Sequence, residues 1–159
     1  VDLAEAVDAD IEINLFNRTE ERMEAIADHL REHGAESIKG LTADGRIPNL
    51  SHERAKVDAD GIGAADVVLV PLEDGDRAEA LGAMGKTEIV IDLNPLSRSA
   101  QVAAIPIVDN IMRAVPNMTA HARDLQGADH ETLAEIVDAF DPEAALTAAE
   151  AAIRDGEPA

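Results

Sequence analysis

Basic and amide side chains recur where predicted strands end, and this is where an open α/β sheet binds its ligands. The polar stretches that follow the predicted strands are 14–19, 71–77, 92–99 and 109–110. Guanidinium groups recognise phosphates through paired N–H donors, so arginines at such an edge point to an anionic ligand. In or just after these stretches lie Arg18, Arg77, Arg98 and Arg113, and the long segment before the second strand adds Arg54 and Lys56. The pattern favours a site for a polyanionic small molecule; the alternative is that the arginines neutralise neighbouring carboxylates.

Other short motifs do not support a phosphate loop, a metal site or a nucleophile. Gly85-Lys86-Thr87 looks like the end of a phosphate-binding loop, but it leads from a helix into a strand, whereas that motif needs the amides of a helix N-terminus. Gly61-Ile62-Gly63 lacks the third glycine of the dinucleotide fingerprint and precedes its strand. His29 and His33 have the spacing of a zinc pair without a third ligand on their helix, so we expect solvated histidines. The chain has no cysteine, which excludes thiolate chemistry.

The charge of the chain limits its partners. Among 159 residues, 33 are acidic and 13 basic, giving a formal net charge of −20. Such a surface repels nucleic acid and anionic membranes, so we expect neither as a partner. The only lysines are Lys39, Lys56 and Lys86, and aromatic residues are nearly absent. Because salt of about 1 M reduces the Debye length to roughly 3 Å, this composition suits molar salt and predicts a halophilic source.

Length and hydropathy indicate one domain in the cytoplasm. The absence of cysteine is compatible with a reducing compartment, and no apolar run approaches the roughly 20 residues of a membrane span. The opening Val1-Asp2-Leu3-Ala4-Glu5 is acidic where a secretory signal would be basic. Without an initial methionine, it suggests the continuation of a longer chain.

Alternating strand and helix patterns predict an α/β fold with a mostly parallel sheet flanked by helices. We expect strands at 11–16, 65–71, 87–92 and 105–108. The β-branched run at 65–71 is typical of a strand buried on both faces, and Pro106 favours an edge position for the last strand. Segment 37–61 is loop-like and long enough to suggest a function.

The helices follow the same logic. One should begin after Thr19 and end near Gly34, with an apolar face formed by Met23, Ile26, Ala27 and Leu30. Others should span about 76–84 and follow Asn110, the latter interrupted at Pro116. Asp129 and Asp141-Pro142 predict two further helices. We therefore divide the chain into an α/β sheet domain, residues 1–126, and a C-terminal helical tail, residues 127–159, packed on that domain or on a partner subunit. The resemblance described next implies that the first of these is a Rossmann-like nucleotide-binding domain.

Five longer segments carry a resemblance to a known family: 14–20, 56–58, 64–77, 92–98 and 107–111. Together they resemble the archaeal 4-phosphopantoate–β-alanine ligases, also called phosphopantothenate synthetases. The resemblance implies a Rossmann-like homodimer that uses ATP and Mg²⁺ to join 4-phosphopantoate to β-alanine in archaeal coenzyme A synthesis. The reaction would pass through an acyl-adenylate and release pyrophosphate and AMP.

The resemblance also implies site residues. Contacts to ATP, partly through backbone groups, are expected from Asp92, Leu93, Asn94, Arg98, Ser99, Asn110 and Ile111. We expect Arg98 and Asn94 to be catalytic, and charge and position add Lys86. The same reasoning assigns substrate binding to Asn14, Arg18, Arg54, Lys56 and Arg77. Arg98 and Mg²⁺ would hold phosphates, with Asp74, Asp76 or Asp109 as an anchor for the metal.

Family members carry a further N-terminal segment with active-site arginines, so we expect this chain to fold and to bind ATP weakly while making no product by itself. Two other readings stay open at this point. One is a nicotinamide-dependent oxidoreductase on the same fold, since fold does not settle function. The other is a non-catalytic module that binds a nucleotide or assembles with a partner chain.

Overall fold

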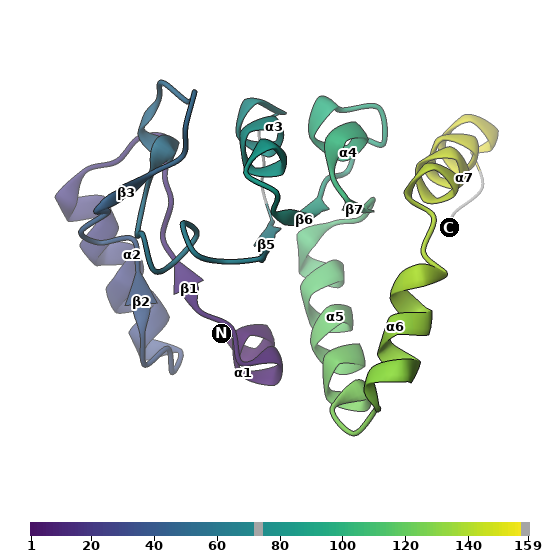
Figure 1. The fold of residues 1–159 in the computed structure, drawn as a ribbon, viewed down its shortest axis with the longest axis horizontal. Helices are drawn as coiled ribbons and strands as arrows, with labels where there is room; N and C mark the ends of the chain where they lie inside the picture. The colour runs from purple at the N-terminus through teal and green to yellow at the C-terminus, as the bar shows by residue number, and fades with distance from the viewer. Residues whose placement is uncertain (72–74, 157–159) are drawn as a thin grey trace.

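Parallel strands form the centre of the structure, a computed structural model that describes residues 1–71 and 75–156 (Figure 1). Three of them hydrogen-bond in the order β5-β6-β7, and β1 pairs in parallel with β2. A two-residue antiparallel ladder joins β3 and β4. The predicted α/β class with a mostly parallel sheet is therefore confirmed. The strands are β1 (Ile11–Glu12), β2 (Ile38–Lys39), β3 (Gly45–Arg46), β4 (Lys56–Val57), β5 (Val67–Val70), β6 (Thr87–Ile91) and β7 (Ile105–Ile107).

Aliphatic residues lie opposite one another in the three-stranded sheet, as the sequence suggests. Val70 of β5 lies opposite Val90 of β6, and Val90 is opposite Pro106 of β7. Because β7 has a strand on one side only, proline is tolerated there, as predicted. Burial of β5 on both faces is wrong, since Val67 is exposed while Val68 and Val70 are buried.

Seven α-helices and one 3₁₀ turn are found in the described part of the chain. They are α1 (Asp2–Val7), α2 (Glu20–Glu32), η1 (Glu53–Ala55), α3 (Gly75–Ala83), α4 (Arg98–Val102), α5 (Ile111–Leu125), α6 (His130–Asp138) and α7 (Pro142–Asp155). The predicted helix starts are confirmed, because each cap side chain accepts a backbone N–H two or three residues on. These bonds are 3.3 Å at Thr19, 2.8 Å at Asp129 and 3.0 Å at Asp141.

Two local predictions are wrong. The first strand ends at Glu12 instead of residue 16, and just beyond it the Asn14 side chain donates to the Arg54 and Lys56 carbonyls. Helix α5 continues through Pro116 without interruption, and just beyond it the Thr119 hydroxyl donates to the Val115 carbonyl at 2.8 Å. The last two residues of the polar stretch 92–99 begin α4.

Two apolar clusters form the core around β5 and α2. The first joins the segment 47–57 to β5 and α3, with Ile47, Val57 and Leu81 almost fully buried. Segment 37–61 is thus part of the core and contains β2, β3, η1 and β4, where the sequence suggested a loop. The second cluster confirms the predicted face of α2: Met23 and Ala27 are buried beside Ile13.

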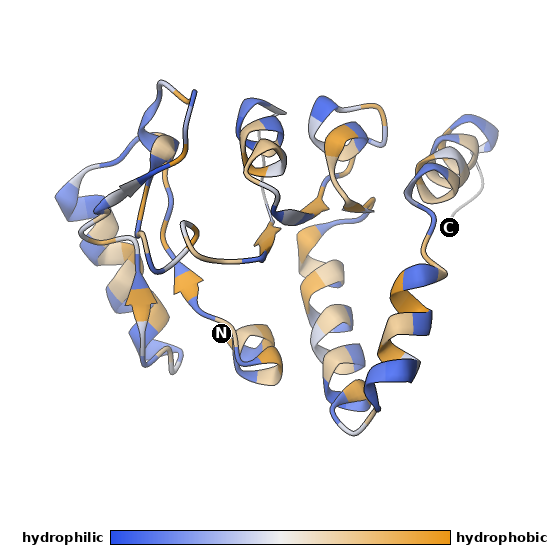
Figure 2. Cartoon of the chain, viewed as in Figure 1, coloured by the Kyte–Doolittle hydropathy of each residue, from blue (hydrophilic) through white to orange (hydrophobic). Residues whose placement is uncertain are grey.

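Helices α3 and α4 lie side by side against β6, while α5 leaves the opposite side of the sheet (Figure 1). Helices α6 and α7 follow α5; α7 contacts β7, and neither helix contains a buried residue. Figure 2 shows hydrophobic segments on α5 and α6. None of the helices in the described ranges is long and apolar enough to cross a membrane. The boundary at residues 126 and 127 stays a prediction.

Candidate functional site

The loop after β6 is held in one shape by its own side chains. Asp92 follows the strand directly, and its two carboxylate oxygens accept the Asn94 amide at 2.9 Å and the Ser97 hydroxyl at 2.6 Å. The Asn94 side-chain oxygen in turn accepts the Leu96 amide at 3.0 Å. These bonds are typical of Asx turns, which fix a loop without a regular element. Leu93 and Leu96 are left exposed on the same loop.

The start of α5 lies at the same edge of the sheet. The Asp92 amide donates to the Ile107 carbonyl at 3.0 Å, which joins the ends of β6 and β7. Asn110 then caps α5 by accepting the Met112 amide at 2.9 Å. Hydrogen bonds from Arg113 and from the Asn110 amide lower the pKa of Asp109. The edge thus gathers the residues predicted to contact ATP, with Ile111 exposed and Ser99 buried inside α4.

Arg98, at the start of α4, reaches α3. Its guanidinium pairs with Asp76, and its Nε lies 3.6 Å from a Glu79 carboxylate oxygen. A Cβ at Gly75 would lie 2.9 Å from the Cγ of Arg98, so glycine leaves room for this side chain. The arginine does neutralise carboxylates, as the alternative reading expected. However, the Arg98 and Asp76 side chains are 55% and 63% exposed, and such a pair contributes under about 1 kcal/mol, so Arg98 stays available to an anion.

A second cluster surrounds the end of β1 and is centred on Asn14. The Asn14 side-chain nitrogen donates to the Arg54 carbonyl at 3.2 Å and to the Lys56 carbonyl at 2.8 Å. Its side-chain oxygen accepts a hydrogen bond from Arg77, which is 5% exposed. Asn14 therefore ties β1, η1 with β4, and α3 together. Since Asp76 contacts Arg98 and the next residue, Arg77, contacts Asn14, the first turn of α3 connects the two clusters.

Beside this second cluster lies a cavity of about 220 Å³, at the start of α2. Arg18 donates through Nη2 to the Gly40 and Leu41 carbonyls at 2.5 and 2.9 Å. Its Nη1 is buried and has no hydrogen-bond partner among the described residues. Lys56 pairs with Glu53 at 2.8 Å, and this bond lowers the pKa of Glu53. The cavity is lined by Arg18, Thr19, Glu20, Met23, Glu24, Leu41, Glu53 and Lys56.

Lys86 is not brought to either cluster. It precedes β6, so it lies at the amino end of the parallel strands, opposite the edge described above. Its ammonium group donates to the Gly63 and Ala65 carbonyls at 3.0 and 2.6 Å. These bonds join the start of β6 to the turn before β5. A catalytic role for Lys86 stays a prediction that the geometry does not support.

The three carboxylates proposed as metal anchors do not form a cluster among the described residues. Asp74 lies outside the described residues. Asp76 pairs with Arg98, and Asp109 accepts the Nε of Arg113 at 2.9 Å. Within 1–71 and 75–156 there is no group of three or more metal-ligating side chains. A Mg²⁺ at this edge would therefore depend mainly on the oxygens of a bound phosphate, as this ion commonly does.

Sequence reasoning missed an aromatic contact beside the second cluster. The Phe16 ring lies 5.2 Å from the His52 ring, and the Arg54 guanidinium is 5.9 Å above the Phe16 ring. A cation over an aromatic face is favourable by about 0.5–1 kcal/mol at an exposed site. The signal available in the sequence was that Phe16 is one of only two aromatic residues.

The fold and these clusters define a class, an α/β domain whose carboxyl edge presents cationic and amide side chains. Residues 1–156 match the family model of phosphopantothenate/pantothenate synthetase, and the chain belongs to this family. The resemblance noted from the sequence is thereby confirmed.

Individual proteins similar to this chain support the same family. A 4-phosphopantoate–beta-alanine ligase from Thermococcus kodakarensis is 56% identical over 142 residues, which cover 89% of this chain and 54% of the relative. The enzyme of the same name from Methanosarcina mazei is 46% identical over 149 residues, or 94% of this chain and 58% of the relative. One from Methanospirillum hungatei is 50% identical over 117 residues, covering 74% of this chain and 47% of the relative. The chain thus spans about half the length of the curated relatives it matches.

Proposed function

We propose that this chain forms part of an ATP-dependent ligase that condenses 4-phosphopantoate with β-alanine to give 4'-phosphopantothenate, a step of archaeal coenzyme A biosynthesis. The relatives that carry this name are 46–56% identical to most of the chain. The observation that carries the proposal is the first turn of α3, where Asp76 and Arg77 connect the two polar clusters. A ligase needs two anionic substrates held side by side, and this edge offers two adjacent places for them.

In this proposal each of the two clusters binds a different substrate. ATP binds at Asp92 to Ser99 and at Asn110 with Ile111, where the loop is already shaped by its own hydrogen bonds. The phosphate of 4-phosphopantoate binds among the cations near Asn14, namely Arg18, Arg54, Lys56 and Arg77. The distinction follows from shape: the first place is an exposed edge with leucines, and the second borders a small, partly enclosed cavity.

The chemistry requires positioning more than a protein nucleophile. The carboxylate of 4-phosphopantoate attacks the α-phosphorus of ATP, the bond to the β,γ-phosphates breaks, and pyrophosphate leaves. The amine of β-alanine then attacks the acyl carbon of the adenylate, loses a proton, and AMP leaves. Both steps bring anions together, so cations fixed in advance lower the barrier. In this proposal Arg98 is the cation that contacts the phosphates of ATP, and Asn94 acts with it.

Mg²⁺ fits this edge as an ion carried by ATP. When bound, it supplies positive charge that neutralises the triphosphate. Asp76 and Asp109 are the described carboxylates at the edge that could hold it, each after exchange of an arginine partner. One or two carboxylates together with phosphate oxygens are a common Mg²⁺ environment in ATP-using enzymes.

We further propose that two copies of the chain pair through exposed apolar faces of α5, α6 and α7, and that the enzyme works in the cytoplasm, where ATP is abundant. Helices α6 and α7 bury no residue within the described part of one chain. Large apolar side chains exposed on these helices are Ile111, Met112, Ile136, Val137 and Ile153, and Phe140 is exposed between α6 and α7. An apolar surface of this kind is typical of an interface.

The test uses a chimera in which residues 1–159 replace the matching segment of the Thermococcus kodakarensis ligase. In molar KCl with Mg²⁺, it should release AMP from ATP only when 4-phosphopantoate and β-alanine are both present. Arg98→Ala should lower kcat/KM by about 10²–10³-fold, or roughly 2.7–4 kcal/mol, because a cation at the developing charge is lost.

Arg31→Ala is the matched control, since Arg31 pairs with Asp28 at 2.8 Å and is about half exposed but lies on α2. It should leave turnover unchanged. Unchanged turnover in Arg98→Ala removes Arg98 from the site. No AMP from the unmodified chimera, together with a thermal shift by NAD or NADP and none by ATP, overturns the ligase proposal.

A further inference from the structure

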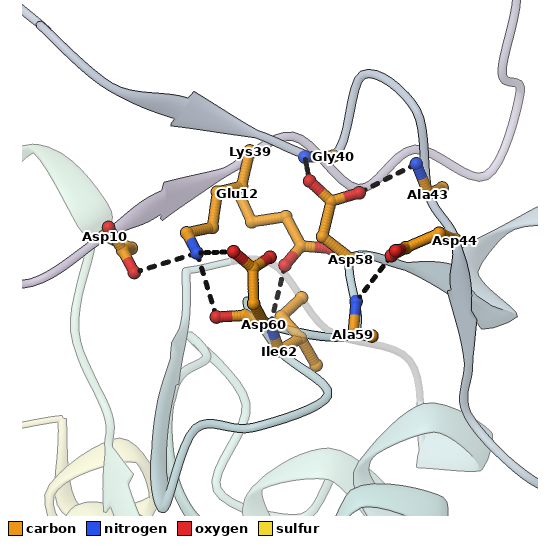
Figure 3. Close-up of polar contacts among 10 residues, drawn as sticks. All are labelled: Asp10, Glu12, Lys39, Gly40, Ala43, Asp44, Asp58, Ala59, Asp60 and Ile62. Carbon is orange, nitrogen blue, oxygen red and sulfur yellow. Dashed lines mark hydrogen bonds and ion pairs between the residues drawn. The ribbon is translucent and has the colours of Figure 1, made fainter.

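Three carboxylates, those of Glu12, Asp44 and Asp58, accept five backbone N–H groups around the ends of β1 and β4 (Figure 3). Glu12 accepts the Asp58 and Ile62 amides at 2.9 and 2.6 Å. Asp58 accepts the Gly40 and Ala43 amides at 2.7 Å each. These bonds join segments 46 and 50 residues apart for Glu12, and 18 and 15 for Asp58.

The packing around these carboxylates is close. A Cβ on Gly61 would overlap the Glu12 carboxylate, and a Cβ on Gly40 would overlap the Ile13 carbonyl. Burial raises the pKa of Glu12, although the amide hydrogen bonds from Ile62 and Asp58 favour its charged form. Burying the Glu12 carboxylate costs free energy that its amide hydrogen bonds offset, which suggests a role for the geometry that these bonds impose.

Hydrogen bonds of Gly40 connect one of these carboxylates, Asp58, to Arg18. The Gly40 amide is held by Asp58, while the Gly40 carbonyl accepts the Arg18 guanidinium at 2.5 Å. The adjacent Leu41 carbonyl accepts the same nitrogen at 2.9 Å. Gly40 has φ +89°, a conformation that side chains rarely adopt, and it turns its two peptide groups toward these two partners. Asp58 thus determines where the carbonyls that orient Arg18 lie.

We propose that Asp58 is a positioning residue for Arg18, which it acts on through the backbone of Gly40 and Leu41. The inference rests on the proposed function, in which Arg18 binds the phosphate of 4-phosphopantoate beside the 220 Å³ cavity. With Nη2 bound to two carbonyls, Nη1 has no partner among the described residues and is the donor left for that phosphate. An anion-binding group that is oriented in advance loses less freedom on binding, and a misplacement of about 1 Å can cost 10²-fold in rate.

The first test is Asp58→Asn in the chimera described above. Asparagine keeps the size of the side chain but points an NH₂ group at one of the two amides, so the loop 40–43 loses one of its anchors. We expect the KM for 4-phosphopantoate to rise about tenfold while the KM for ATP changes less than about twofold. A double-mutant cycle with Arg18→Ala should show that Asp58→Asn adds little once Arg18 is absent.

Asp44→Asn is the matched control, because Asp44 accepts the Ala59 amide at 2.8 Å in the same region, and Ala59 lies outside the loop 40–43 that holds Arg18. It should not change the KM for 4-phosphopantoate selectively. A selective rise in Asp44→Asn, equal rises for both substrates in Asp58→Asn, or an undiminished effect in the Arg18→Ala background overturns the proposal.

A second measurement separates this inference from the ligase proposal. Amide hydrogen exchange at Gly40 and Ala43 should accelerate at least about tenfold in Asp58→Asn and not in Asp44→Asn; unchanged exchange overturns the inference even if the chimera is inactive. If Asp58→Asn does not fold, Glu12→Gln, which places an NH₂ group against one of the Asp58 and Ile62 amides that Glu12 accepts, should give a smaller selective rise in the same KM. If the chimera releases no AMP but amide exchange at Gly40 and Ala43 accelerates in Asp58→Asn and not in Asp44→Asn, the result counts against the ligase proposal alone.

Discussion

At the scale of single residues, the position of Gly40 requires a glycine, because an amino acid with a side chain would not fit its backbone conformation and surroundings. Its φ of +89° lies in the left-handed region, and a Cβ there would overlap the Ile13 carbonyl and lie 3.0 Å from the Ile13 amide. Both neighbours are backbone atoms of the core, so they cannot move aside as a flexible side chain would. The glycine therefore serves stability as well as the placing of Arg18.

Gly40→Ala should lower the free energy of unfolding by about 2–3 kcal/mol, because strain and overlap add. Urea unfolding in molar KCl measures the change. Gly82→Ala is the control: Gly82 lies in α3, and a Cβ added there would meet no described atom within 4 Å, so alanine in this helix should raise stability by about 0.5–1 kcal/mol. Equal midpoints for Gly40→Ala and the wild type would show that the loop adapts.

At the scale of elements, α6 is a helix whose apolar face stays uncovered by the described part of its own chain. It is capped by Asp129 and has an apolar stripe that includes Ile136 and Val137; both are exposed, as is Phe140 just beyond the end of the helix. Isolated helices of this length are marginal in water and gain most of their stability from packing. An ordered α6 therefore requires a surface that covers this stripe.

Val137→Asp should convert the proposed pair of chains into monomers, because Val137 is 65% exposed in one chain and the charge would have to be buried in the proposed interface. Sedimentation velocity in about 2 M KCl would detect the change. Ala134→Asp adds the same charge outside the stripe and should leave the pair intact. A wild-type chain that sediments as a monomer contradicts pairing through this face.

At the scale of the whole molecule, charge is the dominant feature. The net charge of −20 is spread over a single small chain, and many carboxylates have no basic residue with which to pair. Repulsion among them disfavours the compact state at low ionic strength and is screened when the Debye length falls to a few ångströms.

The melting temperature should therefore rise by an amount on the order of 10 °C between about 0.1 and 2 M KCl. Circular dichroism melts across that range measure it. Replacing KCl by sucrose at equal osmolality should give a much smaller rise, since a neutral solute does not screen charge. A melting temperature that does not depend on salt would assign the acidity to another cause than adaptation to salt.

The sequence by itself determined the class, the family and most of the local elements. The β-branched runs of β5 and β6, the caps Thr19, Asp129 and Asp141, and the apolar face of α2 are local patterns whose physics acts over a few residues. The polar stretches at strand ends predicted which edge of the sheet holds the candidate site, because parallel strands bring their carboxyl ends together.

Only the tertiary structure decided which groups meet. Asn14 reaches Arg77 across 63 residues, and Glu12 reaches Ile62 across 50. It also placed Lys86 at the far end of β6, bonded to carbonyls. Periodicity reports which face of an element is apolar, but it carries no information on which distant backbone N–H a carboxylate will accept. Segment 37–61 therefore looked loop-like in sequence, although in the fold the Gly40 amide bonds to Asp58 and the Gly40 carbonyl bonds to Arg18, which lines the cavity.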